Sequence, residues 1–288
     1  MRNSEISPVS LLTSDDSRLT IFRTSYPINQ EICPMTIIDT HCHLYSEEFK
    51  ADIDAVIERA QAYGVAKFYL PAIDSEVIAD MLALEARYPG ICIPMMGLHP
   101  CYVKENYKQE LAIAEEWLQK RPFPAIGEIG LDFYWDKTFV KEQHEAFTVQ
   151  MQWAQDRNLP IVIHTRNAMQ ETIEAVKPFA AKGLRGIFHC FSGSYESAQQ
   201  IVNMGFYLGI GGVITYKNAG LPAALENIGL EYLVLETDAP YLTPVPFRGK
   251  RNESGYLQYV VEKMAEVKKV SVEEVAAITT ANAFQIFH

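Results

Sequence analysis

The sequence has few cysteines and no long apolar run. Its 288 residues include five cysteines, and none of them forms a CxxC pair. An odd number without paired spacing argues against a disulfide framework and a zinc-thiolate site, and it predicts a reducing, cytoplasmic location. No apolar stretch approaches the roughly 18 residues of a membrane span, and the N-terminus lacks the apolar core of a signal peptide. We therefore expect no membrane association.

The sequence also has fewer positively than negatively charged residues. The chain carries 25 Lys and Arg against 36 Asp and Glu, which gives a formal net charge of −11. A broad basic groove for nucleic acid is not expected from this balance. Any phosphate binding must then be local, and bound divalent cations could supply positive charge at the one place where it is needed.

No GxGxxG motif follows the first strand-like run, which removes the usual signal of a dinucleotide-binding sheet. Instead, short β-rich runs alternate with polar turns and amphipathic helices from Met35 onward. Eight runs have strand character: 36–43, 66–73, 91–98, 124–131, 160–165, 185–190, 207–211 and 232–238. Eight strands with helical patterns between most of them predict a parallel (β/α)8 TIM barrel.

The helical patterns have clear apolar faces. One face carries Ile53, Val56, Ile57 and Ala60 before Gly64, and another carries Phe139, Ala146, Phe147, Met151 and Ala154 before Pro160. Residues 256–287 read as one or two closing helices. Residues 1–34 have no sustained period, so we predict a dispensable N-terminal extension followed by a single barrel domain of residues 35–288.

Polar residues recur where the predicted strands end. Five of the seven histidines lie there, together with one Glu and one Asp: His41, His43, His99, His164, His189, Glu128 and Asp238. Each histidine taken singly fits a hydrogen-bonded core or rim residue better than a functional one. Together they match the way in which a barrel enzyme builds its active site, from the carboxyl ends of successive strands.

The first of these strand ends has the spacing of a metal-binding pair. In Asp39-Thr40-His41-Cys42-His43, the two imidazoles are two residues apart. Side chains alternate along a strand, so His41 and His43 should project to one side, about 6 to 7 Å apart, with Cys42 facing the other way. That separation suits a single divalent cation.

The complete set of four His, one Glu and one Asp is sufficient for two divalent ions, which we leave open as Mg, Mn or Zn. We assign one ion to His41, His43, Glu128 and Asp238, and the other to Glu128, His164 and His189. Glu128 is the expected bridge, because its strand lies between the two histidine groups. Two bridged ions would activate a water molecule and orient a phosphate. Asp238 could accept the proton, so Glu128 and Asp238 are the expected catalytic residues.

Five motifs resemble, in order and spacing, the TatD family of metal-dependent hydrolases. They are Asp39-Thr40-His41-Cys42-His43-Leu44, Gly97-Leu98-His99-Pro100, Ala125-Ile126-Gly127-Glu128-Ile129-Gly130-Leu131-Asp132, His189-Cys190-Phe191-Ser192-Gly193 and Glu236-Thr237-Asp238-Ala239-Pro240-Tyr241-Leu242. The resemblance runs from about Met35 to the C-terminus. It implies a TIM barrel, divalent metals held by the same six residues, and DNase activity that generally acts from DNA ends. The loop 243–254 is also similar, except that Ser254 stands where Pro is usual.

Several neighbouring residues have two readings. His99 either faces the substrate or supports a ligand by a hydrogen bond, and Glu236 either orients a ligand or faces the surface. Four cations follow strands five and eight and are either phosphate contacts or solvated rim charges: Arg166, Arg248, Lys250 and Arg251. Three aromatic residues either stack on bases or pack against the barrel: Trp135, Phe191 and Tyr241.

Two other functions share parts of this pattern. An amidohydrolase or esterase acting on a small cyclic amide, lactone or phosphoester can have the same barrel and HxH strand, but many dinuclear members bridge their ions with a carboxylated Lys where this chain has Glu128. A barrel that binds nucleic acid or protein without catalysis should show gaps in the ligand set, and none is visible. We therefore expect an exonuclease acting on single-stranded DNA ends, without an obligate protein partner.

Overall fold

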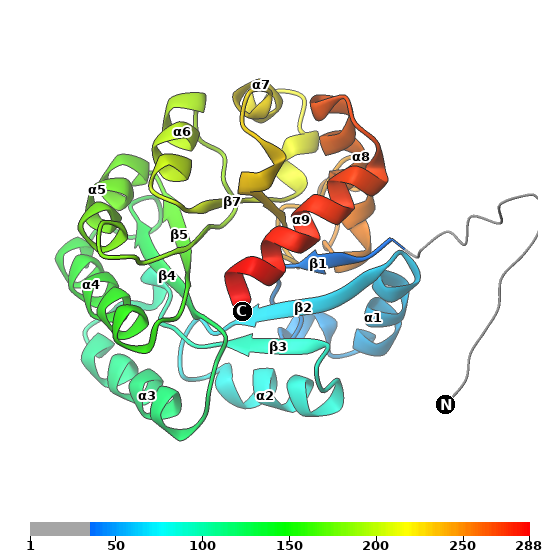
Figure 1. The fold of residues 1–288 in the computed structure, drawn as a ribbon. Helices are drawn as coiled ribbons and strands as arrows, with labels where there is room; N and C mark the ends of the chain where they lie inside the picture. Colours follow the sequence, from blue (N-terminus) through cyan, green and yellow to red (C-terminus); the bar gives the residue numbers. More distant parts are fainter. Residues whose placement is uncertain (1–34) are drawn as a thin grey trace, which may run out of the picture. The chain divides into compact units, whose positions relative to one another are not determined.

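The structure is a computed structural model that describes residues 35–288 (Figure 1). Its strands are β1 (Ile37–Asp39), β2 (Val65–Pro71), β3 (Cys92–Met95), β4 (Ile126–Asp132), β5 (Ile161–Arg166), β6 (Gly186–Phe188), β7 (Tyr207–Ile210) and β8 (Leu233–Leu235). Every neighbouring pair within the sheets is parallel. All eight predicted strands are present, and the predicted barrel is confirmed. The predicted extension, residues 1–34, lies outside the described residues.

The barrel is built from two sheets. One has the order β1-β2-β3, and the other runs from β4 to β8 in sequence order. A single parallel bridge between Met96 and Ile126 joins β3 to β4. At the second seam, the Thr40 amide donates to the Leu235 carbonyl over 3.0 Å, which joins the end of β1 to β8. Regular strand pairing is therefore interrupted at both seams.

Helices surround the strands (Figure 1). They are α1 (Ile53–Ala62), α2 (Ile78–Arg87), α3 (Tyr107–Lys120), α4 (Val140–Arg157), α5 (Met169–Ala180), α6 (Tyr195–Asn203), α7 (Leu221–Leu225), α8 (Leu257–Lys268) and α9 (Val272–Phe287). The apolar face predicted for α1 is buried, and so are the α4 residues Ala146, Phe147, Met151 and Ala154. No helix between residues 35 and 288 has the length and apolar character needed to cross a membrane.

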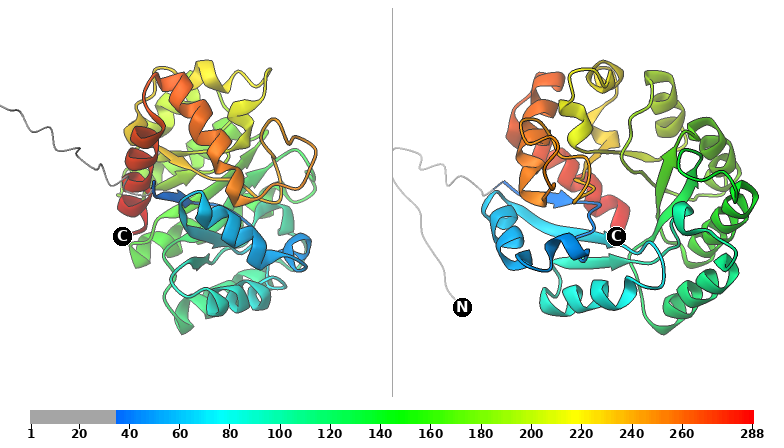
Figure 2. Two further views of the ribbon diagram at one scale, coloured as in Figure 1. Left: turned by 90° about the vertical axis from the view of Figure 1, so that its right-hand side faces the viewer. Right: turned by 180° about the vertical axis from the view of Figure 1, so that it is seen from behind.

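The last helix, α9, closes the amino-terminal end of the barrel (Figures 1 and 2). It begins at a cap in which Ser271 Oγ accepts a hydrogen bond from the Glu274 amide. Thr280 bonds the carbonyl of Thr36, which precedes β1, and Asn282 bonds the carbonyl of Leu233, the first residue of β8. Phe287 stacks on Tyr69 inside the barrel, with ring centroids 3.8 Å apart. The opposite end is left free for the polar residues.

The predicted first strand extends too far. β1 ends at Asp39, so His41 and His43 lie just after the strand and not within it. The segment still follows the barrel wall, because the amides of Thr40 and Cys42 donate in turn to Leu235 on one side and Tyr69 on the other. The regular ladder stops there because amides two residues apart face the same neighbour in a regular strand, whereas these two face opposite neighbours. The two histidines therefore keep their place at the carboxyl end of the barrel.

Candidate metal centre

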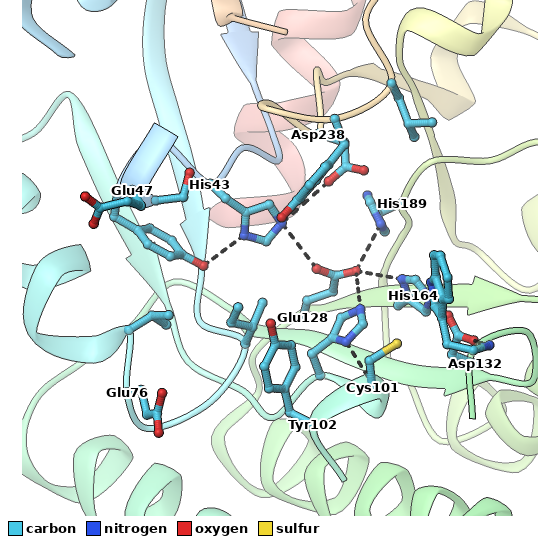
Figure 3. Close-up of a pocket in the computed structure, with 18 of the residues that line it drawn as sticks. His43, Glu47, Glu76, Cys101, Tyr102, Glu128, Asp132, His164, His189 and Asp238 are labelled. Atoms are coloured by element: carbon cyan, nitrogen blue, oxygen red, sulfur yellow. Dashed lines mark hydrogen bonds and ion pairs between the residues drawn. The ribbon is translucent and has the colours of Figure 1, made fainter. Parts of the chain in front are cut away.

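The polar strand ends converge on a cavity of about 910 Å³ at the carboxyl end of the barrel (Figure 3). Six of the residues singled out from the sequence line it: His43, His99, Glu128, His164, His189 and Asp238. His41 lies beneath it and is completely buried. Glu128 and His164 fall within β4 and β5, whereas the others follow the ends of their strands.

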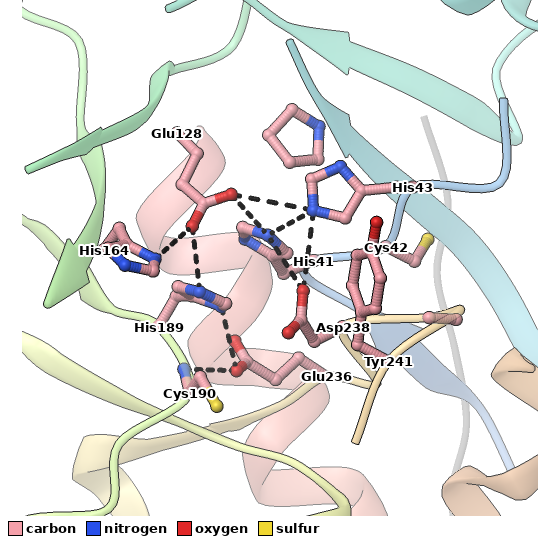
Figure 4. Close-up of polar contacts among 12 residues, drawn as sticks. His41, Cys42, His43, Glu128, His164, His189, Cys190, Glu236, Asp238 and Tyr241 are labelled. Carbon is pink, nitrogen blue, oxygen red and sulfur yellow. Dashed lines mark hydrogen bonds and ion pairs between the residues drawn. The ribbon is translucent and has the colours of Figure 1, made fainter. Parts of the chain in front are cut away.

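Glu128 lies at the centre, and its two oxygens face different groups (Figure 4). Oε2 is 3.1 Å from His41 Nε2 and 3.6 Å from His43 Nε2. Asp238 joins this first group, with Oδ1 3.7 and 3.5 Å from the same two nitrogens. Oε1 is 2.9 Å from His164 Nδ1 and 3.0 Å from His189 Nε2. The structure thus brings the six residues together in the two predicted groups, which share one carboxylate.

The His41 and His43 side chains are closer together than an ideal strand predicts. Their Nε2 atoms are 3.3 Å apart, and the rings meet edge to face with centroids 5.1 Å apart. Both Nε2 atoms therefore converge on Glu128. His41 also stacks on His189, with centroids 3.7 Å apart and an interplanar angle of 13°. This contact joins the two groups in the deepest part of the site.

The outward ring nitrogen of His43 is held by a partner, which fixes the direction of the inward one. Tyr45 donates its hydroxyl hydrogen to the Pro71 carbonyl, so its oxygen accepts from His43 Nδ1 over 2.8 Å. His43 Nε2 therefore turns its lone pair toward the cavity. Proteins commonly prepare metal-ligating imidazoles in this way. The donor set of imidazoles and carboxylates fits borderline or hard divalent ions.

Glu236 lies beside the outward ring nitrogen of His189. Its carboxylate is fully buried, with Oε1 3.3 Å from His189 Nδ1, and it accepts a hydrogen bond from the Cys190 amide. A Cβ atom at Gly209 of β7 would lie 2.1 Å from Oε2, so this glycine provides the space for the carboxylate. The surface-facing reading of Glu236 is wrong, because no part of the residue is exposed.

His99 contacts the second group but presents a different atom to it. The Cys101 amide donates to His99 Nδ1 over 3.1 Å, so in the neutral ring the hydrogen is on Nε2. That nitrogen is 3.3 Å from Glu128 Oε1. His99 therefore offers a hydrogen-bond donor to the cavity where the other imidazoles offer a lone pair. This geometry fits both roles considered for His99, since the donor lies beside the Glu128 carboxylate and the ring also lines the cavity.

Charges within the site oppose the effect of burial. Burial raises the pKa of the Glu128 carboxyl, but the surrounding imidazoles, above all those of His99 and His189, hold it well below its usual range. Burial lowers the pKa of His189, yet the charges of Glu128 and Glu236 outweigh it and raise that pKa well above its ordinary value. The His189 imidazole therefore tends to keep its proton in the metal-free protein, and a cation can replace that proton.

The substrate-side cations predicted from the sequence separate into two groups. Arg166 lines the cavity, and its guanidinium carbon lies 4.1 Å from the centroid of the Tyr134 ring. Arg251 instead forms two hydrogen bonds of 2.8 Å to Asp52, so its charge is already matched. Arg248 packs on the Tyr216 ring at 4.4 Å, and neither Arg248 nor Lys250 is among the residues that line the cavity.

The three aromatic residues also differ. Trp135 and Tyr241 line the cavity and are 67% and 56% exposed. Phe191 is 1% exposed, so the reading in which it stacks on a base is wrong. It packs in the apolar core, because the turn after His189 directs it away from the cavity and into the barrel wall.

Two residues of the site are not singled out by the sequence pattern. Tyr45 holds His43, as described above, and Asp132 holds His164 through a 2.9 Å contact between Oδ2 and Nε2. Asp132 could have been found by the strand-end rule, since it is the last residue of β4. Tyr45 gives no such signal, because its partner Pro71 is 26 residues away in the sequence.

Comparison with known proteins agrees with the fold. Residues 38–288 match the family described as TatD related DNase. The uncharacterized metal-dependent hydrolase YabD of Bacillus subtilis is 40% identical over 87% of this chain and 98% of its own length. YcfH of Escherichia coli, with the same description, is 33% identical over 88% and 96%. The crystal structure of YjjV, a TatD homologue from E. coli K12, superposes with a TM-score of 0.82 at 30% identity, covering 87% of this chain and 97% of that one.

Proposed function

We propose that this chain, which belongs to the TatD family of metal-dependent hydrolases, is a deoxyribonuclease that hydrolyses phosphodiester bonds from the ends of single-stranded DNA. The observation that carries the proposal is the position of Glu128 between two groups of imidazoles. A carboxylate shared between two ligand groups suits two divalent ions, and paired ions are the common device for phosphodiester hydrolysis. The family description, TatD related DNase, agrees with this substrate.

The two ions would be held by different residues. His41, His43 and Asp238 would hold one ion with Glu128 Oε2, and His164 and His189 would hold the other with Oε1. When bound, such ions supply a low-pKa water and neutralise the charge of the phosphate. Mg, Mn and Zn all remain compatible with the donor set.

Two side chains of the protein would act directly on the reacting groups. Asp238 is the more accessible carboxylate, with its side chain 15% exposed against 3% for Glu128. Burial raises its pKa, but hydrogen bonding to His43 and the charges of neighbouring imidazoles lower it below the usual value, so the ionised form can accept a proton from the attacking water. His99 would donate the hydrogen on Nε2 to a phosphate oxygen.

The depth of the site favours attack at a strand end. Glu128 and His189 are 2% and 4% exposed, so the reacting phosphate must enter the cavity. A volume of about 910 Å³ is of the size that holds a small ligand, and it suits a few nucleotides better than a duplex. The net charge of −11 also gives little attraction for long DNA. We further propose a cytoplasmic location, since the four described cysteines are free.

The test compares linear with covalently closed circular single-stranded DNA of the same sequence. Metal-stripped protein is supplied with Mg, Mn or Zn in turn, and nucleotide release is followed over time. We expect release from linear strands only, and loss of that release in Asp238→Asn. Equal degradation of circles would contradict end-directed attack. Hydrolysis of small lactones, amides or esters without any action on DNA would instead support the amidohydrolase reading.

A further inference from the structure

The rim of the cavity has two sides of opposite character. On one side, η1 (Glu47–Phe49) and the start of α2 bring the carboxylates of Glu47, Glu76 and Asp80 to the opening. Lys50 is the cation among them, and it is paired with Glu47 at 2.8 Å and with Asp80 at 3.2 Å. Figure 3 shows Glu47 and Glu76 on the side away from Asp132 and His164. A polyanion is repelled from this acidic side.

Trp135 and Arg166 line the other side, and the ring of Tyr134 packs against Trp135 with centroids 4.9 Å apart. Tyr134 is 51% exposed and Trp135 is 67% exposed. The guanidinium carbon of Arg166 lies 4.1 Å from the centroid of the first ring and 5.1 Å from that of the second. Within residues 35–288, no carboxylate forms an ion pair with Arg166. Tyr134, Trp135 and Arg166 are called the aromatic platform below.

The aromatic platform is held in place by the metal site itself. Asp132 Oδ1 accepts hydrogen bonds from the amides of Tyr134 and Trp135 at 2.9 and 3.0 Å. The other oxygen of the same carboxylate is 2.9 Å from His164 Nε2. The Phe133 amide donates to the Arg166 carbonyl, which ties the platform to the end of β5. The backbone of the platform is therefore held at a fixed position relative to His164, and this pre-organisation lowers the entropic cost of binding.

We propose that the aromatic platform is the subsite that holds the terminal nucleotide of a single strand, with the Trp135 ring stacked on the base and the Arg166 guanidinium paired with a phosphate. Every base has a π-face, so such stacking tolerates any sequence. The guanidinium is suited to phosphate and stacks on aromatic faces at the same time. This proposal rests on the proposed function. It also predicts the route by which the DNA strand enters, which passes over the ends of β4 and β5 and avoids the acidic side.

The base-stacking half is tested with single-stranded oligonucleotides that differ only in their terminal nucleotides, which are either intact or abasic. Phosphorothioate linkages slow hydrolysis, so that binding to the metal-loaded protein is measured by quenching of tryptophan fluorescence. Of the three tryptophans, Trp135 is the one at the cavity, and Trp153 is buried. We expect the wild-type protein to bind intact ends about tenfold more tightly than abasic ends, as a single stacked base implies.

Three variants complete this experiment, with binding followed by anisotropy of a labelled strand. Trp135→Ala should remove the preference for intact ends, whereas Trp135→Phe should keep most of it. Tyr232→Ala is the matched control, since Tyr232 is 39% exposed but lies before β8, at the other end of the barrel. An unchanged preference in Trp135→Ala, or no preference in the wild type, would overturn the stacking role.

The phosphate-binding half is tested by salt dependence. Loss of one phosphate contact should lower the slope of log affinity against log salt by about 0.7. We expect this change in Arg166→Gln, and no change in Arg185→Gln. Arg185 directly precedes β6, and its side chain bonds Asn158, which precedes β5, so both lie at the amino-terminal end of the barrel. An unaltered slope in Arg166→Gln would overturn the phosphate role. The subsite and the proposed function fail separately: protein that binds intact ends selectively without hydrolysing ordinary DNA retains the subsite and loses the nuclease assignment.

Discussion

Asp132 and His164 are joined by a 2.9 Å contact between Oδ2 and Nε2, and this contact turns His164 Nδ1 toward Glu128. The carboxylate thereby sets which nitrogen of the ring faces the cavity. Burial raises the pKa of Asp132, but the hydrogen bond with His164 and two backbone amides outweigh it and hold the pKa below its usual value. An ionised Asp132 is thus the stable partner of the ring.

The first prediction follows from this contact. Asp132→Asn keeps the size of the side chain but places an amide that can donate next to His164 Nε2, which favours the tautomer with a hydrogen on Nδ1. We expect metal affinity to fall by about ten- to a hundredfold, as is typical when the partner of a metal ligand is lost. Calorimetric titration measures it. Asp136→Asn, which alters a surface contact with Lys104, should leave the affinity unchanged; equal losses in both variants would refute the role of Asp132.

The second prediction concerns the shared carboxylate. Glu128→Gln removes the charge that both groups face, so turnover should fall by at least about a hundredfold and the number of bound ions should drop below two. Elemental analysis after dialysis and a single-turnover assay provide the two readouts, with circular dichroism as the control for folding. Full activity with one ion, even at saturating metal, would rule out the two-ion arrangement.

The third prediction concerns pH. Burial lowers the pKa of His164, but its contacts with Asp132 and Glu128 raise it above the ordinary value, and the pKa of His189 is raised in the same direction. Metal binds the neutral rings, so binding at neutral pH must release protons, and affinity must weaken as pH falls further below these raised pKa values. Activity should therefore decline on acidification and be partly restored by excess metal.

Calorimetry in two buffers of different ionisation enthalpy counts the released protons. At pH 7 we expect about one proton or more per chain, together with an affinity that weakens toward about pH 5. Binding without proton release and with a constant affinity over that range would contradict the assigned imidazole ligands.

The fourth prediction concerns the closure of the barrel by α9. Phe287 is 6% exposed and stacks on Tyr69, whereas Phe284 of the same helix is 36% exposed. Phe287→Ala should lower the free energy of unfolding by about 3 kcal/mol, because it leaves a cavity inside the barrel. Phe284→Ala should cost less than about 1 kcal/mol. Urea denaturation at constant metal compares the two, and similar losses would show that α9 does not act as a plug.

The sequence predicts the parts of the site that depend only on the pattern of residues close together along the chain. A polar residue after an apolar run marks a strand end, and the carboxyl ends of parallel strands meet at one end of a barrel. His41, Glu128 and Asp238 could be brought together on this basis. Their role as ligands stays a prediction that the metal titrations test.

Contacts between segments that lie far apart in the sequence cannot be predicted from this local pattern. The charge of Arg251 is matched by Asp52, which is 199 residues away, and the side-chain direction of Phe191 depends on a turn whose amide bonds Gly209. Neither partner is visible from the spacing of residues. The end of the first strand is likewise not visible in the local sequence pattern, because it depends on the amides of Thr40 and Cys42, which donate to Leu235 and Tyr69 on opposite sides.

The division of the barrel into two sheets gives the metal centre a mechanical role. His41, His43 and His99 follow strands of the β1-β2-β3 sheet, whereas Glu128, His164 and His189 belong to or follow strands of the β4 to β8 sheet. The ion assigned to His41, His43, Glu128 and Asp238 would link the two sheets across the seams, where regular strand pairing is interrupted. The metal-loaded protein should therefore exchange the amide hydrogens of Thr40 and Gly127 more slowly than the metal-free protein does. The side chains that bind this ion would then also stabilise the barrel against local opening at its seams.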